Sequence, residues 1–149
     1  MPQITVKIQD INTRRRIPAP RPQKAAAVAP MHNFPIKKFA GYWLPVFVYA
    51  GLIFRLSAIP GSDIPGLFPY QDVVFHFLEY AVFALLLSRA IKAYWPQQKK
   101  MRRLLAVMAL VLVYALSDEF HQLFVPNRTA SLIDVIIDCA GGLSAGIFL

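Results

Sequence analysis

Ionisable and amide side chains interrupt four apolar stretches of this sequence, in each case near one end of the stretch. Histidine and carboxylates are the side chains that most often transfer protons or bind metal ions in proteins. Charges inside membrane-length apolar segments are energetically costly, and they mark a functional site by default. The candidate site residues are Arg55, His76, Glu79, Asp118, Glu119, Gln122, Arg128, Asp134 and Asp138.

The four stretches predict an all-α membrane protein. Of the 149 residues, 56% are hydrophobic, and the segments 46–54, 81–87 and 104–116 contain no charge. Each stretch is close to the roughly 20 residues that a helix needs to cross a bilayer. We therefore predict a four-helix transmembrane bundle over residues 39–149. Its helices are expected at about 39–59, 72–95, 103–124 and 131–149.

The basic residues predict the orientation of these helices. Eight Lys and Arg lie in residues 1–38 and five more between Lys92 and Arg103, whereas the two remaining loops contain only Arg128. The positive-inside rule then places both termini in the cytoplasm. Residues 1–38 are rich in Pro and Ala and are expected to form a disordered tail, with a short strand permitted near Ile4–Ile8. The net charge of +8 is thereby explained, and no nucleic-acid recognition element is visible.

The same orientation places the polar side chains at one depth. At about 1.5 Å per residue, seven of them lie roughly 5–10 Å below the outer boundary of the membrane, namely Arg55, His76, Glu79, Asp118, Glu119, Asp134 and Asp138. We therefore predict one polar site open to the outer face. For Asp72, capping of the helix start is the expected role.

The predicted site holds more negative than positive charge. Five acids face only two permanent cations, Arg55 and Arg128. Protonation of some acids, a divalent metal ion or a cationic group on a ligand could balance this excess. A Zn²⁺ or Mn²⁺ ion would suit His and carboxylate donors, and Mg²⁺ or Ca²⁺ would suit carboxylates alone. The metal candidates are His76, Glu79, Glu119 and Asp134. Without such an ion, no cofactor is expected.

The last apolar stretch contains two glycines four residues apart, Gly142 and Gly146, which would lie on one face of a helix. This spacing lets two helices approach closely. The contact is expected either within the chain or in a homo-oligomer formed through residues 131–149.

Two segments resemble the VanZ-like family. One is Asp118–Arg128 with Asp134 and the glycines at 141–142, and the other is Asp72-x-x-x-His76-Phe77-x-x-Tyr80. Ser57–Pro60 is similar to the end of the family's first helix. The resemblance covers about residues 39–149, and it implies a small bacterial membrane protein; the namesake is associated with teicoplanin resistance. It implies that the site residues are His76, Glu119, Gln122, Pro126, Arg128 and Asp134.

Three departures from the family pattern concern this site. Val73 stands where relatives commonly have Lys, Asp138 where they commonly have Asn, and Asn127 where they commonly have Gly. The first two changes make the site more acidic, which favours a proton or metal ion there.

Three functions are compatible with these features, and the sequence does not decide whether the protein is an enzyme. The first is an envelope protein of the bacterial cytoplasmic membrane whose outer site, surrounded by membrane lipids, binds a lipid-linked envelope precursor or a lipoglycopeptide. The second is a membrane-embedded metal-dependent hydrolase or transferase acting on a lipid-linked substrate. The third is a small proton-coupled carrier that uses the acids as a relay.

Overall fold

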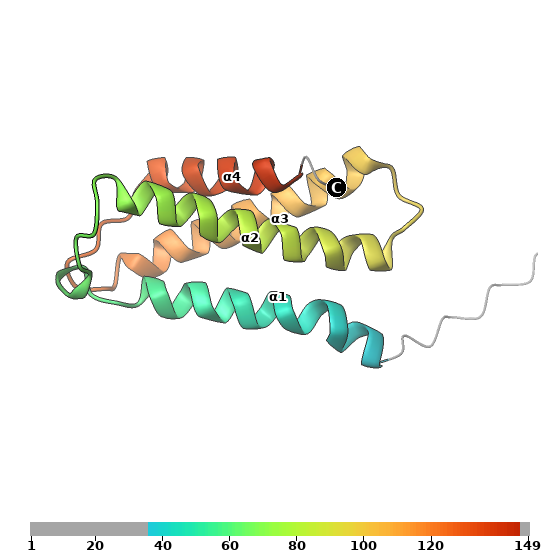
Figure 1. The fold of residues 1–149 in the computed structure, drawn as a ribbon, viewed down its shortest axis with the longest axis horizontal. Coiled ribbons are helices and arrows are strands. Elements are labelled where there is room, and N and C mark those ends of the chain that lie inside the picture. Colours follow the sequence, from blue (N-terminus) through green and yellow to red (C-terminus); the bar gives the residue numbers. More distant parts are fainter. Residues whose placement is uncertain (1–35, 147–149) are drawn as a thin grey trace, which may run out of the picture. The chain divides into compact units, whose positions relative to one another are not determined.

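The computed structural model describes residues 36–146, and this part of the chain is entirely helical apart from its loops (Figure 1). Residues 1–35 and 147–149 lie outside the description, and with them most of the predicted tail and its short strand. The elements are α1 (Ile36–Ser57), the 3₁₀ helix η1 (Gly61–Asp63), α2 (Gln71–Tyr94), α3 (Lys100–Gln122) and α4 (Leu132–Gly146).

Helices α1, α2 and α3 are each long and apolar enough to cross a membrane. Their outer faces carry large apolar side chains, such as Phe47 on α1 and Leu105 on α3, which are 59% and 61% exposed. Exposure of such large apolar faces to water would be unfavourable, so these faces are expected to contact lipid. The prediction of a helical membrane protein is therefore supported. The described part of α4 has 15 residues, about 22 Å of helix.

Two helices begin three residues earlier than the sequence predicted. Helix α1 begins at Ile36 rather than near Phe39, and α3 begins at Lys100 rather than near Arg103. The predicted boundaries were placed where the charged residues give way to apolar ones. Lys and Arg are good helix formers, however, so a helix continues through them beyond its apolar segment.

Helix α2 is the centre of the bundle. It packs most extensively on α4 and also contacts α1 and α3, whereas the contact between α1 and α3 is small. The buried core along α2 includes Tyr80, Ala84, Leu87 and Ile91. The side chains that point from α2 thus meet every other helix.

Glycines on α4 permit its close approach to two neighbours. A Cβ at Gly141 would lie 2.2 Å from the backbone oxygen of Phe77 on α2, and one at Gly142 would lie 3.0 Å from Val111 on α3. The buried small residues of α4 are therefore used for packing inside the chain. A homo-oligomer formed through α4 stays a prediction.

We expect Gly141→Ala to destabilise the bundle, because the added methyl group would overlap backbone that cannot move aside without separating α2 from α4. Overpacking of this kind costs about 1–3 kcal/mol. The measurement is the thermal unfolding midpoint in detergent, and the matched control is Gly51→Ala on α1, where an added Cβ meets nothing within 4 Å. Equal midpoints for the two variants would contradict the close α2–α4 contact.

Candidate functional site

Four helix ends meet at one end of the bundle (Figure 1). These are the C-terminal ends of α1 and α3 and the N-terminal ends of α2 and α4. The two loops between them are joined by a hydrogen bond from the Gly61 amide to the Pro126 carbonyl, of 3.0 Å. A side chain at Gly61 would collide with the Asn127 backbone, so the close contact between the loops requires glycine there.

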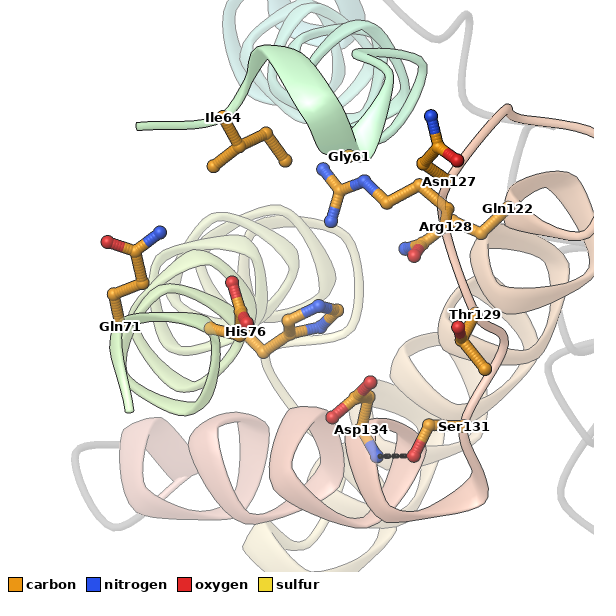
Figure 2. Close-up of a pocket in the computed structure, with 11 residues that line it drawn as sticks. Gly61, Ile64, Gln71, His76, Gln122, Asn127, Arg128, Thr129, Ser131 and Asp134 are labelled. Carbon is orange, nitrogen blue, oxygen red and sulfur yellow. Dashed lines mark hydrogen bonds between the residues drawn. The ribbon is translucent and has the colours of Figure 1, made fainter. Parts of the chain in front are cut away.

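Two adjoining cavities lie beneath these loops. The larger, of about 390 Å³, has a mostly polar wall; the smaller, of about 250 Å³, is bordered also by Leu56, Ile59 and Phe75. Figure 2 shows His76 of α2, Gln122 of α3, Arg128 of the loop between α3 and α4, and Asp134 of α4 directed toward the larger cavity. The larger cavity is lined by Gly61, Ile64, Gln71, Asp72, His76, Gln122, Asn127, Arg128, Thr129, Ser131 and Asp134.

A buried His–carboxylate pair joins α2 to α4. His76 Nδ1 lies 3.0 Å from Asp138 Oδ1, and Asp138 is fully buried while His76 is 8% exposed. A hydrogen bond from Nδ1 to the carboxylate fixes the orientation of the imidazole ring and leaves Nε2 for another partner. Asp138 therefore positions His76 at the cavity wall.

A second buried carboxylate joins α3 to α1. Asp118 Oδ2 accepts hydrogen bonds from the Ser57 hydroxyl at 2.8 Å and from the Gln122 amide at 3.2 Å. All three side chains are buried. Asp118 is thus held as a structural link between the helix ends, although its Oδ1 has no hydrogen-bond partner among the described residues.

Glu119 is fixed by the start of α4. Its Oε2 accepts a hydrogen bond of 2.6 Å from the Ser131 backbone amide, and the Ser131 hydroxyl in turn accepts from the Ile133 and Asp134 amides as the helix cap. Glu119 is 6% exposed, and its Oε1 has no hydrogen-bond partner within the described chain.

Three of the predicted metal candidates lie together. His76, Glu119 and Asp134 each offer one ligand atom, and these atoms lie within 4.8 Å of one another. Glu79, the fourth candidate, is not in this group and instead lines the smaller cavity. The predicted four-residue set is therefore reduced to three that could share an ion.

The two predicted arginines are placed differently. Arg128 lines both cavities, and it donates from Nε to the Ile59 carbonyl at 3.2 Å and from Nη2 to the Leu56 carbonyl at 3.4 Å. Arg55 is exposed and lines neither cavity. At about 100° per residue, Arg55 lies about 200° around α1 from the buried positions Ile53 and Ser57.

Some lining residues were absent from the predicted site. Ser57 could have been found, because its spacing from Val46 and Ile53 places all three on the one buried face of α1. Asp72 borders both cavities and is exposed at the start of α2, where Tyr70 is the cap residue. Thr129 carries no comparable sequence signal, since it lies in a loop.

The sequence was compared with known protein families, curated proteins and solved structures. A family profile described as VanZ/LLP1 matches residues 73–149. This chain belongs to the VanZ/LLP1 family. No curated protein and no solved structure matches the chain. The match confirms the resemblance and covers most of α2 and all of α3 and α4, so Ser57 and α1 lie outside the matched VanZ/LLP1 region.

One departure from the VanZ-like pattern has a structural explanation. Asn127, where the resemblance to the VanZ-like family leads us to expect Gly, has a φ of 56°. Among residues with a side chain, Asn adopts this left-handed conformation with little cost. The substitution therefore preserves the turn that presents Arg128 to the cavity.

We expect Arg128→Ala to lower stability, because the Ile59 carbonyl loses its Arg128 donor and the Leu56 carbonyl keeps only the Ile59 amide. The loss of hydrogen bonds to a charged group amounts to about 1.5–3 kcal/mol. The unfolding midpoint of the purified protein, without added ligand, measures this loss. The control is Arg55→Ala, whose side chain is exposed and which should change the midpoint little. A larger loss for Arg55→Ala would contradict the assignment.

Proposed function

We propose that this VanZ/LLP1 membrane protein binds an amphiphilic ligand at the outer face of the bacterial cytoplasmic membrane. The headgroup would occupy the larger, polar cavity and the hydrocarbon chain the smaller one. A lipid-linked envelope precursor and an acylated glycopeptide each combine a polar headgroup with a hydrocarbon chain. Binding of the acylated glycopeptide would imply a role in glycopeptide resistance.

The observation that supports the proposal is that a cavity with a mostly polar lining adjoins a cavity with a more apolar lining. Ile64, Asp72, His76, Gln122 and Arg128 line both cavities, so one ligand could extend from one into the other. Carboxylate, amide and hydroxyl groups dominate the larger cavity and suit a headgroup rich in hydroxyl or amino groups. The apolar residues Leu56, Ile59 and Phe75 border only the smaller cavity and suit a hydrocarbon chain.

The outer location rests on the distribution of basic residues. The end of the bundle opposite the cavities carries Lys99, Lys100, Arg102 and Arg103, whereas the loops at the cavity end carry only Arg128. The positive-inside rule then favours cytoplasmic termini. This orientation requires α4 to act as a fourth crossing, and it opens the cavities to the outer side.

The geometry gives less support to a carrier. Beyond the site, the buried core is formed mainly by apolar side chains, among them Leu87, Ile91, Val107 and Val111. A proton relay needs closely spaced polar groups across the membrane. The alternative of a metal-dependent hydrolase or transferase depends on whether the protein binds a metal ion.

The proposal predicts saturable binding of fluorescently labelled teicoplanin to the full chain in lipid nanodiscs. The same glycopeptide without its acyl chain should bind at least about tenfold more weakly, because each buried CH₂ contributes about 0.8 kcal/mol. Fluorescence anisotropy gives both dissociation constants.

A matched pair of variants tests the location of binding. Ile64→Trp should fill the junction of the cavities and weaken binding of the acylated compound about tenfold or more, by removing the buried volume available to the chain. Leu67→Trp is the control, since Leu67 lies in the same loop but is 65% exposed and lines neither cavity. Equal affinities for the acylated and deacylated compounds, or equal effects of the two variants, would refute the proposal.

A further inference from the structure

We propose that His76, Glu119 and Asp134 form a binding site for one divalent transition-metal ion beside the larger cavity, which His76 and Asp134 line. Their ligand atoms come from α2, α3 and α4 and lie within 4.8 Å of one another. This separation allows one ion at about 2.0–2.2 Å from each donor after a small movement of the side chains.

The free oxygen of Glu119 is the strongest single indication of a missing partner. Glu119 is 94% shielded from solvent, and Oε2 is already bonded to the Ser131 amide. Oε1 has no hydrogen-bond partner among the described residues although it is buried. An unpaired buried carboxylate oxygen is energetically unfavourable, and a cation between Glu119, His76 and Asp134 would give it a partner.

The orientation of His76 fits a metal ligand. Its Nδ1 faces the Asp138 carboxylate at 3.0 Å, so Nε2 can present its lone pair to the cavity, which His76 lines. In protein metal sites the second ring nitrogen of a ligating histidine commonly donates to a carboxylate in this way. Asp138, which is fully buried, would thus be a positioning residue rather than a ligand.

The charge balance also calls for a cation. Glu79, Asp118, Glu119, Asp134 and Asp138 all lie at the cavity end of the bundle, and Arg128 is the only permanently charged cation among the described residues that line the cavities. The guanidinium of Arg128 is directed to the carbonyls at the end of α1. A divalent ion would offset part of the excess negative charge.

The donor set indicates the class of ion. One imidazole and two carboxylates suit Zn²⁺ and Mn²⁺ better than Ca²⁺ or Mg²⁺, which prefer oxygen donors alone. Three protein ligands leave coordination positions open toward the cavity for water or for an oxygen of a bound headgroup. The ion site rests on its own residues and does not require that an amphiphile bind.

The test is metal binding by the full chain in detergent, purified without a histidine tag, stripped with a chelator and then dialysed against micromolar Zn²⁺. We expect about one Zn²⁺ per chain by inductively coupled plasma mass spectrometry. Co²⁺ in place of Zn²⁺ should give visible absorption bands of a four- or five-coordinate ion. Substoichiometric metal, with no Co²⁺ bands, would overturn the proposal.

Substitutions at the proposed metal ligands are compared with a substitution at a histidine outside the cluster. Glu119→Gln keeps an acceptor for the Ser131 amide but loses the charge, and His76→Asn removes the imidazole; each should weaken Zn²⁺ binding at least about tenfold. His121→Asn is the matched control, because His121 stacks on Phe54 at a centroid distance of 4.1 Å and is outside the cluster. All variants are checked for a monodisperse elution profile. Unchanged Zn²⁺ affinity in folded Glu119→Gln would overturn the site.

Asp138→Asn tests the positioning role separately. The variant should still bind one Co²⁺ at saturation with the same absorption bands, but with roughly 10- to 100-fold lower affinity. An unchanged affinity would remove Asp138 from the proposal. Teicoplanin binding measured with and without chelator distinguishes a failure of the metal site from a failure of the proposed function.

Discussion

The contact between His76 and Asp138 is the interaction on which the site depends. It joins two fully or nearly fully buried polar groups across the α2–α4 interface at 3.0 Å. Such a pair is favourable in a medium of low dielectric constant only when both partners are held in place. Gly141, about one turn farther along α4, allows this by bringing the α4 backbone against Phe77. The packing of the bundle and the chemistry of the cavity are therefore coupled through one interface.

The site is built by helix ends rather than by helix middles. Ser131 caps α4 and also fixes Glu119, while Arg128 donates to the carbonyls of Leu56, in the last turn of α1, and of Ile59, just beyond it. Both residues thus satisfy backbone groups that a helix terminus leaves unpaired. In a membrane these groups have few other partners, so the short loops at this end stabilise the helices and shape the cavity at the same time.

Features that depend on neighbouring residues in the chain could be predicted from the sequence. Apolar length located the helices, and polar residues at one end of each predicted that they would converge. The inward direction of a side chain depends on packing, however. Arg55 and Ser57 are two residues apart on α1, yet only Ser57 faces the bundle. Likewise, helical spacing alone could not show that Glu79 lines a different cavity from the one that Asp134 lines.

The proposed function requires the cavities to open to the outer side of the membrane. Single cysteines placed in a Cys139→Ser background and treated in intact cells with a membrane-impermeant maleimide test it most directly. The variant Leu67→Cys, at a 65% exposed position in the loop at the cavity end, should be labelled without permeabilisation. Cysteine at Gln98, in the loop at the opposite end, should be labelled only after it. The reverse pattern would place the cavities on the cytoplasmic side and contradict the account.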